Sequence, residues 1–434
     1  MENKRPEWTS YLSFIFATVG SAVGLGNIWR FPYIMGENGG AVFLIVYLVM
    51  ISLVCAVPLC MELAMGKIYK SCPISVYEKI NPKFKPLGYL CFITPILIQA
   101  FYYVVGGWIL NYLWIFITNS SVNDFSAYFQ TLSANPFLSY LFTLLFLIMA
   151  AIFPYFGINK GIEKANNIIM PLFGIMLIAL VICALNLSGA KEGLLFMFHP
   201  DFTKLTPKMF LAALGQALFT LSIGMGIMIT YGSYLKKDVD VKKSAYTLIF
   251  FDTLVAVLAG MIIFPIVFST GIEPTSGAKL VFISLPQIFS MLPFSSFFAV
   301  VFFFLLFFAA ITSGISLFET SVSCFVDYYK FKRNKASVLT FLIIALLSLP
   351  ASLSFGLLSD FKIFDKTYFD FLDYITSNMF MPFGTLMVCI IAGYFAKNVA
   401  DEAFSNSKYG RFLTFLLKYV IPLIFIYVLI TGLN

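Results

Sequence analysis

The chain contains about eleven apolar runs that are long enough to cross a lipid bilayer, which takes roughly 20 residues of helix. They lie near residues 11–35, 40–68, 88–118, 136–155, 164–187, 208–235, 243–270, 293–329, 337–354, 374–396 and 411–432. Of the 434 residues, 60% are hydrophobic and only 11% are charged, which is more apolar side chain than a domain in water can bury. The sequence therefore predicts an all-α protein that crosses the bilayer repeatedly, as a single domain over residues 1–434.

The distribution of basic residues predicts the orientation. Most lysine and arginine residues lie at one set of helix ends, and the opposite loops carry few of them. By the positive-inside rule the N-terminus is expected in the cytoplasm, and an odd number of crossings places Asn434 outside the cell. Met1–Trp8 is polar and gives no cleavable signal, so the expected location is the inner (plasma) membrane. The loops at 188–207 and 271–292 are long enough to form external lids.

Histidine and cysteine usage argues against an enzyme or a metal protein. His199 is the only histidine, and the seven cysteines are scattered without a metal-binding or disulfide spacing. The acids are isolated, so no convergent acid–base groups indicate catalysis. The net charge of +7 fits membrane topology, and no basic patch indicates nucleic acid.

Two of the apolar runs are interrupted by glycines at mid-depth. The stretch GSAVGLGNIWRFP at 20–32 contains Gly24 and Gly26, and TLSIGMG in the sixth run contains Gly224 and Gly226. The two runs enter the membrane from opposite sides, so the interruptions meet near the midplane in opposite senses. Paired breaks of this kind are typical of inverted-repeat transporters with a central site, although glycines also mark close helix packing. We therefore expect the first and sixth helices to be unwound around a central site, in an inverted-repeat arrangement.

Unwound backbone inside the membrane exposes peptide groups that must find partners. Freed carbonyl oxygens suit Na⁺, and the N–H groups that begin a half-helix suit a carboxylate. Polar side chains lie beside both breaks, Asn27 at the first and Thr220 and Ser222 at the second. Thr312 and Ser313 lie midway along a phenylalanine-rich run, where the alternative is hydrogen bonding to the preceding helical turn.

Asp252 is an acid deep in the seventh run. Counting from Lys243 at about 1.5 Å per residue places it roughly 14 Å into the membrane, close to the bilayer centre. A carboxylate there costs about 2.5–3.5 kcal/mol, which a bound cation or a proton would offset. The alternative is a protonated structural aspartate.

Two pairs of opposite charges are candidate gates. Arg30 and Asp373 are expected near the outer surface, and Arg5 and Asp327 near the cytoplasmic surface. Exposed ion pairs contribute little to stability, but a pair that breaks as a pathway opens can bias two conformations.

Several long motifs resemble the neurotransmitter:sodium symporters, and in particular their bacterial amino-acid transporters, including the leucine transporter. The motifs are NIWRFPY (27–33), ENGG (37–40), NKGIEKANNIIMP (159–171), GQALFTLSIGMG (215–226), YGSYLKKD (231–238) and FFAAITSGIS (307–316). The resemblance covers nearly the whole chain, although many relatives have twelve helices where this chain has eleven. It implies a five-plus-five inverted repeat of residues 1–190 and 191–398, followed by an eleventh helix in 399–434. It also implies transport coupled to about two Na⁺ ions.

The resemblance also implies two sodium sites. The first would use the carbonyl of Ala22 with Asn27, Thr220 and Asp252. The second would use the carbonyls of Gly20, Val23 and Ala309 with the hydroxyls of Thr312 and Ser313.

For the substrate, the resemblance implies recognition of an amino acid at both ends. Its carboxylate would meet the amides around Gly26, the hydroxyl of Tyr103 and the first sodium ion. Its amine would meet the carbonyls of Ala22, Phe219 and Thr220, near Ser222. The side-chain pocket would be formed by Gln99, Phe219, Met225, Ser313 and Leu317, where Gln99 either contacts a polar tip or bonds to a neighbouring helix.

The same relatives imply the gates. Phe219 would close over the substrate below Arg30 and Asp373, and Arg5 and Asp327 would form the inner gate with Tyr234. Glu319 stands where the leucine transporter has a glutamine, which suggests that inner opening depends on pH. The Gly161–Pro171 spacing resembles the element that lets the fifth helix loosen at its cytoplasmic end and release sodium.

Three departures from the relatives bear on the ligand. Gly24 stands where amine transporters place an aspartate, so the substrate should carry its own carboxylate. Asp252 stands where the leucine transporter has an asparagine, and Ala256 stands where chloride-dependent relatives have a serine. The other chloride-type residues, Tyr47, Gln216 and Thr220, are present. We expect transport without chloride, with Asp252 supplying the negative charge and taking a proton on the return step.

The sequence as a whole predicts a sodium-coupled importer of a hydrophobic or aromatic L-amino acid, working as a monomer or weak dimer. Two alternatives stay open: a symporter of another small zwitterion, such as GABA or a betaine-like solute, and a non-transporting amino-acid sensor. A sensor or a leak channel would need a signalling domain or a continuous polar stripe, and the sequence contains neither.

Overall fold

The computed structural model describes residues 5–118, 120, 122–270, 280–291, 295–404 and 408–432. Within these residues, nine helices are long and apolar enough to cross a membrane, and a bent pair makes a tenth. The predicted run at 208–235 is divided into two shorter helices, which accounts for the eleventh crossing. The all-α class is confirmed. The orientation of Asn434 and most of the proposed lid at 271–292 lie outside the described residues.

The first half of the chain forms α1 (Tyr11–Ala22), η1 (Gly26–Arg30), α2 (Phe31–Glu37), α3 (Ala41–Val49), η2 (Met50–Cys55), α4 (Ala56–Tyr69), α5 (Pro73–Ile80), η3 (Pro82–Phe84), α6 (Lys85–Ile117), α7 (Phe125–Ala134), α8 (Pro136–Tyr155), η4 (Ile158–Glu163), α9 (Lys164–Leu185), α10 (Ala190–Phe198), η5 (Phe202–Lys204) and α11 (Pro207–Thr220).

The second half forms α12 (Ile227–Gly232), α13 (Val241–Thr270), η6 (Leu280–Ser284), α15 (Leu285–Met291), α16 (Ser295–Asp327), α17 (Arg333–Leu353), β1 (Lys362–Ile363), β2 (Lys366–Thr367), α18 (Tyr368–Tyr374), η7 (Ile375–Phe380), α19 (Met381–Ile390), η8 (Ile391–Phe395), α20 (Lys397–Phe404), α21 (Gly410–Phe415), η9 (Leu416–Val420) and α22 (Ile421–Gly432). The strands form an antiparallel hairpin in which Lys362 pairs with Thr367 and Ile363 with Lys366.

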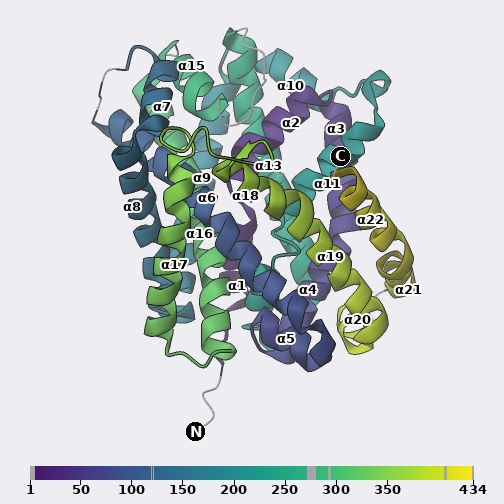
Figure 1. The fold of residues 1–434 in the computed structure, drawn as a ribbon. Helices are drawn as coiled ribbons and strands as arrows, with labels where there is room; N and C mark the ends of the chain where they lie inside the picture. The colour runs from purple at the N-terminus through teal and green to yellow at the C-terminus, as the bar shows by residue number, and fades with distance from the viewer. Residues whose placement is uncertain are drawn as a thin grey trace.

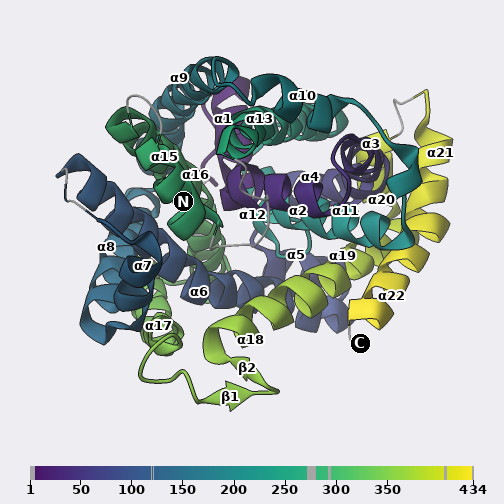
Figure 2. The ribbon, with the colours of Figure 1, turned by 90° about the horizontal axis from the view of Figure 1, so that it is seen from above.

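The long helices run roughly between the two ends of the molecule (Figure 1). In both views α8 and α17 lie at one edge and α21 and α22 at the opposite edge, with α1 between them (Figures 1 and 2). Figure 2 shows α12 in the same central region. The helices at the edges expose apolar side chains, including Ile175 on α9, Leu346 on α17 and Leu423 on α22. Exposed apolar side chains over whole helices fit a lipid environment and not water.

The helices begin where the sequence supplies caps. The hydroxyl of Ser10 accepts a hydrogen bond from the Ser13 amide at the start of α1. Asp124 accepts from the amides of Ser126 and Ala127 at the start of α7, and Asn135 caps α8. These side chains satisfy amides that have no partner within the helix.

Both predicted breaks are present. α1 ends at Ala22, extended Val23 follows, and the chain resumes after Gly26 at an angle of 55°. Between α11 and α12, the φ angles of Ser222, Gly224 and Gly226 are 54°, 84° and 78°. A Cβ atom on Gly224 would overlap the carbonyl group of Met381, so only glycine fits that turn.

The second break is held by a buried acid that the sequence analysis did not single out. Glu62 on α4 is fully buried, and its Oε1 accepts a hydrogen bond of 2.8 Å from the Gly224 amide. A carboxylate from another helix thus replaces the backbone partner that unwinding removes. Such a replacement is needed because the membrane interior offers no water to bind a free amide.

Candidate functional site

A central cavity lies between the two broken helices. It is lined by Ser21, Ala22, Gly24, Leu25, Gly26, Ile98, Tyr102, Phe219, Thr220, Ser222, Met225, Ser313, Ser316 and Leu317. Nine of the eleven residues predicted to contact the substrate are in this list, namely Ala22, Gly24, Gly26, Phe219, Thr220, Ser222, Met225, Ser313 and Leu317. The cavity volume is about 40 Å³, so a bound amino acid would displace flexible side chains such as Met225.

A cluster of oxygen-bearing side chains lies at one side of this cavity. The amide of Asn27 donates to Oδ1 of Asp252 over 2.8 Å, and the hydroxyl of Thr220 lies 2.8 Å from the same oxygen. The Tyr47 hydroxyl is 3.4 Å from Oδ2. The Gly24 amide donates to Oδ1 of Asn27 over 3.0 Å, which fixes that side chain against the break. The structure thus brings together three predicted ligands from α13, α11 and the first break.

A second cluster joins α16 to the end of α1. The Ser313 hydroxyl is 3.2 Å from the carbonyl of Ser21, 3.5 Å from that of Val23 and 3.2 Å from that of Ala309. Thr312 donates to the carbonyl of Phe308 over 2.9 Å. The alternative of bonding to the preceding turn is therefore realised for Thr312, yet a hydroxyl that donates retains lone pairs for a cation.

Gly20 lies beside this second cluster. A Cβ atom on Gly20 would be 3.2 Å from Cβ of Thr312, so the backbone of α1 approaches α16 closely there. Together these groups supply carbonyl and hydroxyl oxygens, which are the donors that a hard cation such as Na⁺ takes.

The structure places Tyr102, and not Tyr103, at the cavity. The Tyr102 hydroxyl is buried without a hydrogen-bond partner in the described part of the chain, and it lies near Gly24. The Tyr103 hydroxyl donates to the carbonyl of Gly314 over 2.9 Å and lies 3.0 Å from Oε1 of Gln99. A step of one residue turns a helical side chain by about 100°, so Tyr103 faces α16 instead of the cavity.

Gln99 also lies away from the cavity lining. Its amide donates to the carbonyl of Pro95 over 2.9 Å and lies 3.3 Å from the Ser321 hydroxyl. The structure therefore corresponds to the alternative in which Gln99 bonds to a neighbouring helix.

Phe219 lies between the central cavity and a larger vestibule, since it lines both. The vestibule has a volume of about 420 Å³ and contains Arg30 and Asp373. The expected ion pair between Arg30 and Asp373 is not formed: among the described residues, no hydrogen bond or ion pair joins these two side chains. The Arg30 guanidinium instead lies over the Phe219 ring, 4.8 Å from its centroid, and Asp373 accepts from the Ser377 hydroxyl over 3.0 Å.

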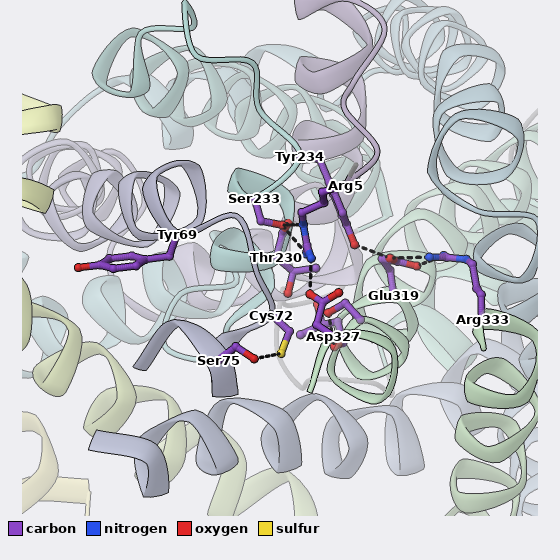
Figure 3. A network of polar contacts seen from close by, with 12 residues as sticks. Arg5, Tyr69, Cys72, Ser75, Thr230, Ser233, Tyr234, Glu319, Asp327 and Arg333 are labelled. Atoms are coloured by element: carbon purple, nitrogen blue, oxygen red, sulfur yellow. Dashed lines mark hydrogen bonds and ion pairs between the residues drawn. The ribbon is translucent and has the colours of Figure 1, made fainter. Parts of the chain in front are cut away.

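The other predicted gate pair, Arg5 and Asp327, is formed. Arg5 forms an ion pair with Asp327, and its Nε and Nη2 donate to the Ser233 hydroxyl over 2.9 and 2.7 Å (Figure 3). The guanidinium also lies over the ring of Tyr234, 4.7 Å from its centroid. The Trp8 amide donates to the Tyr234 carbonyl over 3.0 Å, so the N-terminal segment is held against the end of α12.

Glu319 takes part in a second ion pair, close to that of Arg5 and Asp327, which the sequence did not predict. Its carboxylate binds Arg333 at the start of α17 and accepts a hydrogen bond of 2.7 Å from the Tyr234 hydroxyl (Figure 3). Nε of Arg333 donates to the carbonyl of Pro154 over 2.7 Å. This carboxylate, which is fully buried, thus links α12, α16, α17 and α8.

A family model described as the sodium:neurotransmitter symporter family matches residues 5–131 and 138–434. The chain belongs to this family. It is 37% identical to an uncharacterized sodium-dependent transporter, YhdH, of Bacillus subtilis, across 98% of this chain and 97% of that protein. It is 28% identical to the human sodium- and chloride-dependent GABA transporter 2, across 92% of this chain and 75% of that protein.

The fold comparison agrees with the family. The crystal structure of MhsT in complex with L-phenylalanine superposes with a TM-score of 0.90, at 40% identity, over 99% of this chain and 100% of that chain. The protein is therefore a sodium-dependent symporter with the fold expected from its two broken helices.

Proposed function

We propose that the protein imports a hydrophobic or aromatic L-amino acid together with about two Na⁺ ions. The observation that carries this proposal is the central cavity, where Thr220 joins the lining to the Asn27–Asp252 cluster behind it, and where Ile98, Phe219, Met225 and Leu317 form an apolar wall. Sodium couples to the substrate if the two share a contact in a dry cavity, because each then binds better beside the other.

The neighbouring residues support a zwitterionic substrate. Gly24 offers no carboxylate to a ligand amine, so recognition of the amine depends on carbonyl groups and recognition of the carboxylate on a sodium ion. That the solved MhsT contains L-phenylalanine supports the apolar class for this chain. GABA remains the alternative substrate, since the human relative carries that name.

Charge at the first cluster supports transport without chloride. Ala256 is fully buried and has no hydroxyl, while the Asp252 carboxylate contacts Tyr47 and Thr220, two residues of the chloride-type set. A fixed carboxylate there supplies the negative charge that a chloride ion supplies in the chloride-dependent relatives. Protonation of Asp252 on the return step would restore neutrality once sodium has left.

The function is tested with purified protein in liposomes. We expect L-phenylalanine or another apolar amino acid to drive ²²Na⁺ uptake, at the same rate when gluconate replaces chloride. Binding of the twenty amino acids and GABA, with and without sodium, identifies the substrate. Sodium flux that no amino acid stimulates would refute the proposal, and loss of flux in gluconate would refute the chloride part alone.

The membrane orientation and the assembly belong to the same proposal. We place the Arg5–Asp327 side in the cytoplasm and the vestibule outside the plasma membrane, because the basic residues gather at the Arg5 side. The proposed assembly is a monomer or a weak dimer, in which each chain carries its own cavity and both oxygen clusters.

Replacing Tyr102 by phenylalanine is expected to weaken substrate binding about tenfold, a loss of roughly 1.4 kcal/mol, because its buried hydroxyl lacks a partner until a carboxylate accepts from it. The matched change Tyr103→Phe is expected to leave the dissociation constant within twofold, since that hydroxyl bonds to Gly314. Radioligand saturation binding measures both. Equal losses in the two variants would contradict the assignment of Tyr102.

A further inference from the structure

Asn166, on α9, has a buried oxygen that the sodium sites described above do not use. The residue is fully buried, and its amide nitrogen donates to the carbonyl of Ile162 over 2.9 Å. That bond fixes which end of the carboxamide faces α9. Its Oδ1 therefore points away from α9, and it has no hydrogen-bond partner in the described part of the chain. Buried oxygens of this kind normally have a partner, so an orphan one calls for a partner such as a water molecule or an ion.

The oxygen points at the second sodium cluster. A Cβ atom on Gly20 would lie 2.5 Å from Oδ1 of Asn166 and 3.2 Å from Cβ of Thr312, so all three residues meet at one point. α9 lies beside α1 (Figure 2). The close approach also explains why residue 20 is glycine, since any side chain would displace the carboxamide.

Other oxygens continue from Asn166 toward the Arg5 end of the molecule. Asn159, Glu163 and Asn166 are spaced by four and three residues, which places them on one helical face. The Glu163 carboxylate accepts from the Thr9 amide over 3.3 Å and from the amide of Asn159 over 2.9 Å, and it also binds the Thr9 hydroxyl. Glu163 thus fastens the segment before α1 to η4.

We propose that Oδ1 of Asn166 is an exit ligand, the first oxygen that binds the second sodium ion as it leaves its site toward the cytoplasm. The inference depends on the proposed function and adds the route by which one ion departs. A neutral carboxamide suits this task, because it replaces a lost water or carbonyl ligand without holding the ion as a carboxylate would. The Glu163 carboxylate then becomes available as a ligand for the departing ion when its contact with Thr9 breaks.

The test compares Asn166→Ala and Asn166→Asp with Asn186→Ala. Asn186 lies at the other end of α9, donates to the i−4 carbonyl of Ile182 over 2.7 Å and is exposed, so its loss removes the same kind of bond far from the ion. Two quantities are measured on the purified full chain: the Na⁺ concentration for half-maximal ²²Na⁺ binding, and the turnover of sodium-driven L-[³H]phenylalanine uptake in liposomes.

We expect Asn166→Ala to change half-maximal sodium binding less than threefold and to reduce turnover at least fivefold. Asn166→Asp should lower the half-maximal concentration at least threefold and also slow turnover, because the carboxylate retains the ion. Asn186→Ala should match the unaltered protein in both.

Turnover of Asn166→Ala within twofold of Asn186→Ala would overturn the inference while leaving the proposed function intact. A loss of ²²Na⁺ binding of more than tenfold in Asn166→Ala would also overturn it, since the oxygen would then be a resident ligand. Absence of sodium-driven uptake by the unaltered protein would contradict the proposed function, and this inference with it.

Discussion

Replacing Asp252 by asparagine is expected to raise the sodium concentration needed for half-maximal substrate binding at least tenfold. The carboxylate is fully buried and lies 2.8 Å from both the Asn27 amide and the Thr220 hydroxyl. Two unit charges about 4 Å apart attract by roughly 4 kcal/mol at an effective dielectric constant near 20. Desolvation of the two charges offsets part of this attraction, but a tenfold change in the sodium concentration needs only about 1.4 kcal/mol. A sodium titration of radioligand binding measures the shift.

Asparagine has nearly the shape of aspartate, so the variant tests charge more than packing. Asp238→Asn is the matched control. Asp238 is exposed in the segment between α12 and α13, so this variant makes the same chemical change away from the cavity. The control should bind substrate with the sodium dependence of the unaltered protein. An Asp252→Asn variant with unchanged sodium dependence would show that the negative charge of Asp252 does not contribute to sodium binding.

The sequence predicted the feature that organises the fold. The two Gly-x-Gly motifs indicated breaks, and the structure has positive φ at Gly224 and Gly226 and a 55° bend after Ala22. Such breaks can be read locally because glycine tolerates backbone conformations that other residues avoid. The polar side chains beside them, Asn27 and Thr220, followed from the same local argument.

Choices that depend on helix rotation could not be made from the sequence. After Gln99, the stretch AFYYVV in α6 carries no charged or amide side chain on any face, so its periodicity gives no face, and Tyr102 and Tyr103 cannot be told apart. For the same reason, the sequence could not decide whether Gln99 contacts the substrate or a neighbouring helix. Only the packing of α6 against α16 directs one tyrosine to Gly314 and the other to the cavity.

Contacts between residues far apart in the chain could not be predicted from the sequence either. Glu62 is an acid within an apolar run, which by the cost argument used for Asp252 should have been marked as a site. Its partner, the Gly224 amide, is 162 positions away. Arg333 looked like one of many cytoplasmic charges until the structure placed it against the buried Glu319.

Replacing Arg5 by alanine is expected to abolish most sodium-driven uptake and to expose Cys72 at the inner gate. Cys72 is fully buried and lies close to Asp327 (Figure 3). The change removes the ion pair with Asp327, both bonds to Ser233 and the contact with Tyr234. A partly buried carboxylate without its partner disfavours the closed state, and every 1.4 kcal/mol shifts the population of open molecules about tenfold.

Alkylation of Cys72 by a charged maleimide measures that population, because the thiol reacts only when the gate opens and water reaches it. We expect labelling in Arg5→Ala to be at least ten times faster than in the unaltered protein, and Cys72→Ser in the same background to remove the gain. Lys83→Ala, which deletes an exposed positive charge near the start of α6, should label at the unaltered rate. If Arg5→Ala retained slow labelling and normal uptake, the Arg5–Asp327 pair would be a surface contact without a role in closing the inner side. Fast labelling combined with loss of uptake would show that a transporter loaded from outside must hold this pair closed until its cargo is bound.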